Sequence, residues 1–195
     1  MAGILAWHFV GATLRNGDPV PPDGEWLEYG GKLEMCERGL HASRRLIDAL
    51  QYSPGSTICR VRCDGEIVEG NDKLVCSRRK IVWRLDGEVL LRDFARWCAR
   101  SVLHLWDAPL VVVQYLESGD EPLRAAARDA AWAAARAAAW AAAAPAAWAA
   151  AAPAARAAAR AAAWDAAWDA ARDAAWDSQN AELTRMVMHL HKKGS

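Results

Sequence analysis

At 195 residues, the chain has room for one ordinary domain with an appendage. Its 24 lysines and arginines balance 24 aspartates and glutamates, and this zero net charge argues against bulk attraction to nucleic acid. Charges interrupt every apolar run of the length of a membrane span, so we expect no membrane partner. The first residues lack a basic leader with a cleavage site, and the five cysteines are an odd number, which favours free thiols in a reducing cytoplasm.

The composition changes near Gly119 and predicts two regions. Residues 1–119 hold twelve of the thirteen glycines and most of the β-branched residues, whereas residues 120–195 consist mainly of Ala, Trp, Arg and Asp. We therefore expect an α+β fold. It would have a domain at 1–119 with a small mixed or antiparallel sheet and flanking helices, followed at 120–195 by an Ala/Trp-rich α-helical hairpin.

Short strands and helices alternate along the first region. Segments rich in Ile, Val, Trp or Cys between turn residues predict strands at 4–10, 56–65 and 79–85. Apolar residues at helical spacing predict helices at 43–52, 87–106 and, in a short form, within 109–122. Ser43 is the expected N-cap of the first of these helices. The prolines and glycines of residues 16–24 predict a loop.

A four-residue repeat dominates the second region. Over residues 124–176, Trp or Arg recurs at nearly every fourth position, and most of the residues between are alanine, the best helix former. Pro145 and Pro153 predict a break, so we expect helical arms at about 122–143 and about 154–191. Residues 122–160 are basic and residues 161–182 are acidic, which favours antiparallel packing of the two arms with tryptophans in the seam.

Three roles stay open for this repeat. A passive helical scaffold is a common role of low-complexity segments. An interaction surface is the second role, since exposed Trp and Arg are typical of interface hot spots, and it would predict self-association, most simply as a dimer. Stacking on single-stranded nucleic acid is the third, and the interspersed aspartates disfavour it.

The candidate site residues lie in the first region. A strand carrying His8 is followed by "GLHASRRLIDALQY" at 39–52, then by a strand pair and by "NDKLVC" at 71–76. This order and spacing resembles the ADP-ribosyltransferase fold in its poly-ADP-ribose-polymerase-like form, over roughly residues 4–85. The resemblance implies that the ligand is NAD or an ADP-ribose-type nucleotide.

The resemblance also implies a role for each of four residues. His8 would hold the adenosine ribose of NAD, and His41 and Tyr52 would sandwich the nicotinamide ring. Asp72 would lie near the carboxylate that orients the reacting ribose, so Asp72 and His41 are the candidate catalytic residues. His41 stands where the family has a tyrosine, and Asp72 is one methylene shorter than the family's glutamate. Transfer, hydrolysis and binding without turnover therefore all stay open.

Each of these residues also has an ordinary structural interpretation. His8 could be an outward-facing strand residue, and His41 could hydrogen-bond its own loop. Tyr52 could pack under the next turn, and Asp72 is a standard turn residue. The run "CSRRK" at 76–80 could grip a phosphate or pyrophosphate, although a solvated strand edge is the simpler interpretation.

A zinc site is the other chemistry that the residues suggest. Cys59 and Cys63 are four apart on a predicted strand and so point to one face, and Cys36 and His41 share a short loop. The chain has no Cys-x-x-Cys pair and no second cluster, so we expect no metal and instead buried, free cysteines.

The whole chain is similar to a group of uncharacterised bacterial and phage proteins that join a Gly-(Phe/Leu)-His-Ala motif, here "GLHAS", to a tail of Ala/Trp/Asp/Arg repeats. Some proteins with similar tails are described as immunity proteins. We therefore expect a nucleotide-binding protein of a bacterial or phage-infected cell, acting in phage–host conflict. The alternative is a non-enzymatic immunity or anti-defence protein that binds a protein partner through its Trp/Arg-rich helices.

Overall fold

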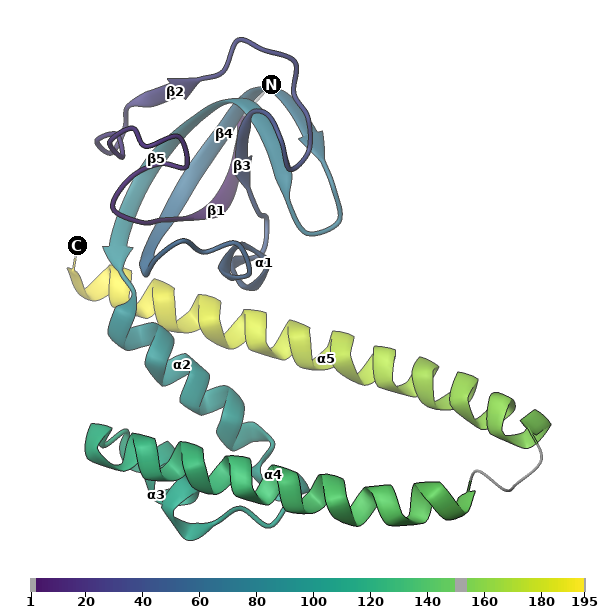
Figure 1. The fold of residues 1–195 in the computed structure, drawn as a ribbon. Coiled ribbons are helices and arrows are strands. Elements are labelled where there is room, and N and C mark those ends of the chain that lie inside the picture. Colours follow the sequence, from purple (N-terminus) through teal and green to yellow (C-terminus); the bar gives the residue numbers. More distant parts are fainter. Residues whose placement is uncertain (1–2, 150–153, 195) are drawn as a thin grey trace. The chain divides into compact units, whose positions relative to one another are not determined.

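The computed structural model describes the backbone of residues 3–149 and 154–194 and the side chains of residues 3–137 and 172–194. It confirms the α+β class, with an antiparallel sheet and several helices (Figure 1). The chain forms two compact units. Unit 1 comprises the residues up to Leu91 together with those from Trp176 onward, and unit 2 comprises Arg92–Ala175.

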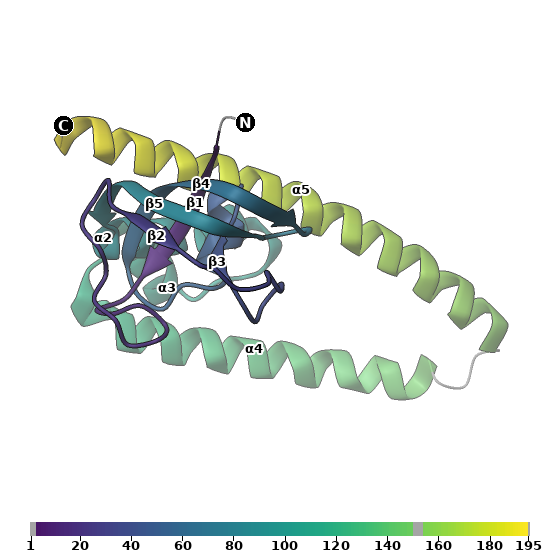
Figure 2. The same cartoon turned by 90° about the horizontal axis from the view of Figure 1, so that it is seen from above.

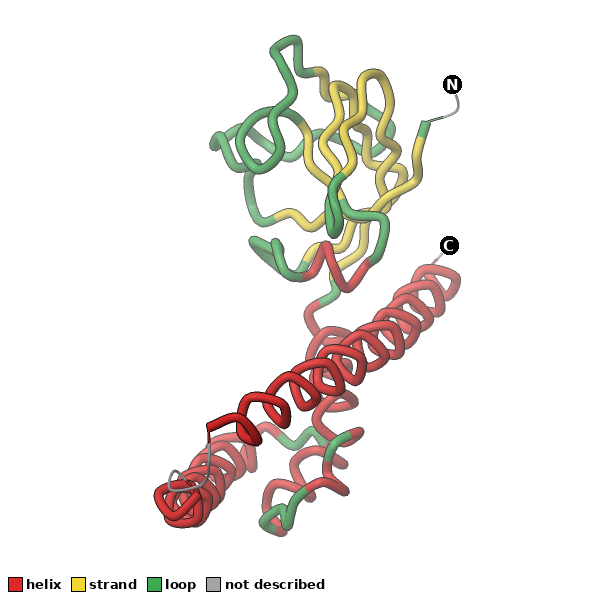
Figure 3. The backbone as a smooth tube through the Cα atoms, turned by 90° about the vertical axis from the view of Figure 1, so that its right-hand side faces the viewer, coloured by secondary structure: helices red, strands yellow, loops and turns green. Residues whose placement is uncertain are grey.

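The sheet of unit 1 has five strands, all paired antiparallel. They are β1 (Ile4–Val10), β2 (Trp26–Glu28), β3 (Leu40–Ala42), β4 (Thr57–Glu69) and β5 (Leu74–Asp86). The order is β1-β4-β5-β2, and β3 also pairs with β5. Because Ser43, just after β3, exchanges backbone hydrogen bonds with Trp7 of β1, the sheet curves back on itself (Figure 3).

The predicted strands are confirmed, but two of them are longer than expected. β1 has the predicted bounds. β4 and β5 extend toward each other and form a hairpin, with 13 residues in each strand and a short turn between them. β2 and β3 were not predicted. Each has three residues, too few to show an alternating pattern, and each owes its strand conformation to pairing with β5. The segment 16–24 contains no helix or strand, as expected.

The first helix is shorter than predicted, and Ser43 is not its N-cap. α1 spans Leu46–Leu50 and begins after Arg45, which makes no side-chain capping hydrogen bond. Ser43 is buried and its backbone is bridged to Trp7, so two further residues, Arg44 and Arg45, precede the helix. The bridge between strands therefore outweighs the local capping preference of serine.

Two faces of the sheet are buried. On the interior face, alternate residues of β1, β4 and β5 form one cluster, consisting of Ala6, Val10, Ala42, Cys59, Val61, Cys63, Leu74, Cys76 and Ile81. On the opposite face, Trp7 and Phe9 are buried. Leu183 and Val187, in the last turns of α5 (Ala154–Gly194), are fully buried as well, and Figure 2 shows those turns beside the strands.

Unit 2 is helical. Its elements are α2 (Glu88–Ser101), the 3₁₀ turn η1 (Leu103–Leu105), α3 (Leu110–Ser118), α4 (Glu121–Ala149) and the first part of α5. The predicted helix at 87–106 is therefore divided into α2 and η1. Gly119 has a φ of 71°, a left-handed conformation that glycine adopts easily, and it ends α3 before α4 begins. α3 packs on α4 through a small cluster of buried apolar residues, Val112, Leu116 and Ala127.

Both arms of the repeat are helical, as predicted, but the hairpin is not confirmed. α4 continues through Pro145 to Ala149, beyond the expected end near residue 143. The alanines around Pro145 have the highest helix propensity, and so the loss of one N–H donor does not end the helix. The expected break at Pro153 falls in residues 150–153, outside the described residues, and α5 begins at Ala154. The side chains of the predicted seam also lie largely outside the described residues.

Candidate functional site

The interior of the sheet holds two histidines and an arginine. Alternation along β1 places His8 on the same face as Ala6 and Val10, so it is an inward-facing residue, not an outward-facing one. Burial, together with the charges of Arg79 and His41, lowers the pKa of His8 well below its ordinary value of 6.5. Its imidazole is therefore neutral at pH 7.

His41 belongs to the same cluster. It lies on β3 and is half-buried, and its Nε2 accepts a hydrogen bond of 3.0 Å from the backbone N–H of Cys36. Burial lowers the pKa of His41, a hydrogen bond with the backbone of Gly39 partly opposes this, and Arg79 and Lys73 lower it further. His41 therefore bonds its own loop, as its structural interpretation proposed, and is also a neutral side chain at pH 7.

Arg79 is the cation of this cluster. Only 6% of its surface is exposed, so it is not part of a solvated strand edge, and that interpretation of the run at 76–80 is wrong for this residue. Its Nη1 donates a hydrogen bond to the backbone carbonyl of His41. Within the described part of the chain, no carboxylate pairs with Arg79. A buried cation without an anionic partner is costly, and it is a typical feature of sites for anionic ligands.

Three cysteines, Cys59, Cys63 and Cys76, interact electrostatically with Arg79. Burial raises the pKa of Cys59 to about 11. Cys63 donates a hydrogen bond to Cys76, which raises the pKa of Cys63 and lowers that of Cys76. Cys63 lies opposite Arg79 in the β4–β5 ladder. All three cysteines are buried and free, as expected, whereas Cys36 is exposed.

Tyr52, Asp72 and Lys73 form a second group, at the surface. The hydroxyl of Tyr52 donates a hydrogen bond to Oδ2 of Asp72, and Nζ of Lys73 lies 4.1 Å from the centre of the Tyr52 ring. Because 51% of the surface of Tyr52 is exposed, this residue does not pack under the following turn. Hydrogen bonds to Cys36 and Tyr52 raise the pKa of Lys73.

The two groups adjoin through His41. Cys36 hydrogen-bonds to His41 and also interacts with Lys73, and the charge of Lys73 acts on His41. The structure therefore brings His41, Tyr52 and Asp72 to one place around Lys73. His8 lies deeper; the charge of Arg79 lowers its pKa, and Arg79 also donates a hydrogen bond to the backbone of His41.

Sequence reasoning did not single out Lys73 or Arg79 as individual residues of this cluster. Lys73 immediately follows Asp72 in "NDKLVC", and Arg79 lies in the run that suggested a phosphate grip. The usable signal was alternation along the strand, because Arg79 lies two residues from Ile81 and so faces the same side of the sheet. The pairing of Arg79 with Cys63 across the hairpin agrees with this placement. That register was not evident before the full length of β5 was known.

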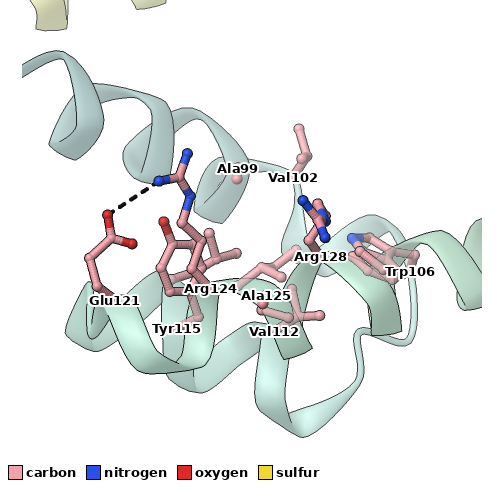
Figure 4. A pocket seen from close by; sticks show the side chains of 13 residues that line it. Ala99, Val102, Trp106, Val112, Tyr115, Glu121, Arg124, Ala125 and Arg128 are labelled. Carbon is pink, nitrogen blue, oxygen red and sulfur yellow. Dashed lines mark hydrogen bonds and ion pairs between the residues drawn. The ribbon is translucent and has the colours of Figure 1, made fainter.

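Unit 2 contains a separate pocket (Figure 4). Its volume is about 630 Å³, and its walls come from the end of α2, η1, α3 and α4. Trp106 and Tyr115 contribute aromatic walls, and Arg124 and Arg128 contribute charge. Arg124 is held by Glu121 at 3.2 Å and Arg128 by Asp129 at 3.3 Å, so both cations are already paired.

Residues 4–93 are similar to a protein family described as a domain of unknown function (DUF7666). This span covers all five strands, α1 and the start of α2, and is a little under half of the chain. No curated protein and no solved structure matches the chain. Among the described residues, no helix is both long enough and apolar enough to cross a membrane.

Proposed function

We propose that unit 1 binds NAD or an ADP-ribose-type nucleotide at the site formed by His8, His41, Tyr52, Lys73 and Arg79. The observation that carries this proposal is Arg79, a buried cation without a carboxylate partner, next to two imidazoles that burial keeps neutral. The positive charge of Arg79 is therefore not neutralised by the described residues, and the pyrophosphate of the ligand would neutralise it.

Each side chain has a role in this proposal. Lys73 at the rim binds a phosphate directly, and Arg79 attracts it from below while fixing the backbone of His41. The exposed ring of Tyr52 stacks on the nicotinamide or on another planar group. The neutral imidazoles of His8 and His41 hydrogen-bond ribose hydroxyls, a role consistent with the resemblance to ADP-ribosyltransferases.

Binding is the primary activity that we propose, with turnover as a second step. Cleavage of the bond to nicotinamide needs a carboxylate near the developing positive charge on the ribose. Asp72 accepts the hydrogen bond of Tyr52 and so orients the ring that would clamp nicotinamide. A nucleotide that is bound and turned over slowly, or not at all, is sequestered, and such sequestration would act in phage–host conflict.

Calorimetric titration of NAD and ADP-ribose into the full chain tests this function. Tyr52→Ala removes both the ring and the hydroxyl, whereas Tyr52→Phe keeps the ring. We expect Tyr52→Ala to weaken NAD binding by at least about tenfold, and Tyr52→Phe by much less, since stacking carries the contact. Tyr29→Ala, a half-buried tyrosine elsewhere in unit 1, is the matched control. Unchanged binding in Tyr52→Ala would contradict the proposal.

A specific observation also favours the second candidate function, protein interaction through the helices. Large apolar side chains are exposed in unit 2: Leu105 by 70%, Leu110 by 72% and Trp132 by 65%. Exposed Trp and Leu beside paired arginines are typical of interfaces, and the helical hairpin of the two arms belongs to this second proposal. Light scattering tests it. The wild type is expected to be a dimer, and Leu110→Ser with Trp132→Ser is expected to be a monomer.

A further inference from the structure

A second pocket lies on the opposite face of the sheet from His8. Side chains alternate along a strand, so Trp7 of β1 and Arg60 of β4 face away from the interior. The strand register aligns Trp7 with Arg60, and Arg60 with Trp83 of β5. These three side chains therefore form one row across three neighbouring strands, on a rigid part of the fold.

The pocket is built around this row. Its volume is about 500 Å³, which is within the range of small-ligand sites, about 300–1,000 Å³. α1 and its preceding residues contribute Arg44, Arg45 and Leu46, and α5 contributes Asn180, Thr184 and Met188. All of these residues belong to unit 1.

The walls of the pocket are both cationic and aromatic. The guanidinium of Arg60 lies 4.4 Å from the ring centre of Trp7, and the rings of Trp7 and Trp83 meet edge to face at 5.7 Å. His191 stacks on Trp83 at 4.0 Å and holds it in place. Three arginines line the pocket, and none of the described residues in its lining is a carboxylate.

The three arginines differ in how they are neutralised. Arg44 is paired with Glu69 through two hydrogen bonds of 2.7 and 2.8 Å. Nη2 of Arg45 lies 2.8 Å from Oδ1 of Asp177 and its Nε lies 3.8 Å from Oδ2 of Asp48, so Arg45 is paired as well. Arg60 makes no hydrogen bond or ion pair with the described residues, and burial lowers its pKa.

We propose that this pocket binds a phosphate monoester with a planar organic body, of the size of a mononucleotide. Arg60 has unused donors for phosphate oxygens, and a guanidinium matches a phosphate with two parallel hydrogen bonds. The accessible apolar surface for the planar body comes from Leu5 and Val82, which are exposed, and from Trp83, which is half-buried. The site is separate from the one in the sheet interior and does not depend on it.

Equilibrium dialysis of the full chain with AMP, adenosine and inorganic phosphate tests the proposal. The variant is Arg60→Gln, which keeps an aliphatic stem over Trp7 but removes the charge. The matched control is Arg62→Gln, on the same face of β4 but outside the pocket lining. We expect AMP binding to weaken at least about tenfold in Arg60→Gln and less than about twofold in Arg62→Gln. Adenosine is expected to bind at least about tenfold more weakly than AMP, and phosphate is expected to compete with AMP.

The outcomes separate this pocket from the nucleotide site proposed above. Loss of AMP binding in Arg60→Gln but not in Tyr52→Ala supports the pocket, whether or not ADP-ribose binds elsewhere. Loss in Tyr52→Ala but not in Arg60→Gln places AMP at the His41 site and overturns the pocket. No AMP binding by the wild type, or equal binding of AMP and adenosine, overturns it as well. Thermal unfolding of Arg60→Gln, compared with Arg62→Gln, verifies that the variant is folded.

Discussion

The indole N–H of Trp176 donates a hydrogen bond of 2.8 Å to Oδ1 of Asp48, a residue 128 positions earlier in the chain. Trp176 is the last tryptophan of the four-residue repeat, and Asp48 is a buried residue of α1. Next to this bond, Arg45 pairs with Asp177 at 2.8 Å. The end of the repeat is therefore part of unit 1, where it neutralises and covers the first helix.

Trp176→Phe is expected to destabilise the chain by about 1–3 kcal/mol, because it leaves the carboxylate of Asp48 buried with one partner fewer. Urea unfolding followed by far-ultraviolet circular dichroism measures the change. Trp132→Phe, at a position that is 65% exposed, is the control and should have almost no effect. Equal stability of the two variants would mean that the bond to Asp48 does not hold α5 on unit 1.

Leu183→Ala is expected to cost about 2–5 kcal/mol, since Leu183 is fully buried and its removal leaves a cavity. Leu190→Ala, on the same helix but 40% exposed, should cost far less. The comparison uses the same unfolding measurement. A fragment ending at Gly119 lacks Leu183 and Val187 and is expected to be unstable, so binding experiments need the full chain.

Acidification is expected to destabilise the protein below about pH 6.5. The folded-state pKa of His8 is lowered, so the unfolded chain binds more protons in this range and stability falls as the pH falls toward the folded pKa. The pKa of His41 is lowered too, so His41 contributes in the same range. The pKa values of Glu69 and Glu182 are lowered from 4.5, so their effect begins at lower pH. His8→Gln should make the stability profile less steep between pH 6.5 and 4.5. An equally steep profile in this variant would show that His8 is not the group responsible.

Thiol labelling should distinguish the cysteines. Cys36 is exposed and is expected to react rapidly with a maleimide at pH 7.5, whereas Cys59, Cys63 and Cys76 should react only after unfolding. Burial raises the pKa of Cys59 to about 11, which further slows its reaction. Mass spectrometry of the labelled peptides locates the label. Rapid labelling of Cys59 in the folded protein would contradict the placement of β4.

Local patterns predicted some elements well and others not at all. The bounds of β1 followed from alternation and turn signals, and the start of α5 at Ala154 followed from Pro153. β3 could not be predicted, because Leu40–Ala42 is a strand only through its pairing with β5. The predicted N-cap at Ser43 was wrong for the same reason. The backbone of Ser43 pairs with Trp7 of β1, and its side chain does not cap α1.

The candidate site was predicted in part. The sequence order singled out His41, Tyr52 and Asp72, which the structure places together around Lys73. Arg79 was visible only as one cation in a basic run, and its burial depends on the long hairpin of β4 and β5. The row of Trp7, Arg60 and Trp83 depends on the register of three strands, which no local pattern specifies.

Titration of ADP-ribose into the full-length wild type and its Lys73→Ala variant tests the central claim most directly. Lys73 lies over the ring of Tyr52 and acts on His41, so it is the cation at the rim of the proposed site. Lys32→Ala, at an exposed position, is the control. The proposal predicts saturable binding by the wild type and by Lys32→Ala, and binding at least about tenfold weaker in Lys73→Ala. Absence of binding by the wild type, or equal binding by all three proteins, would contradict it.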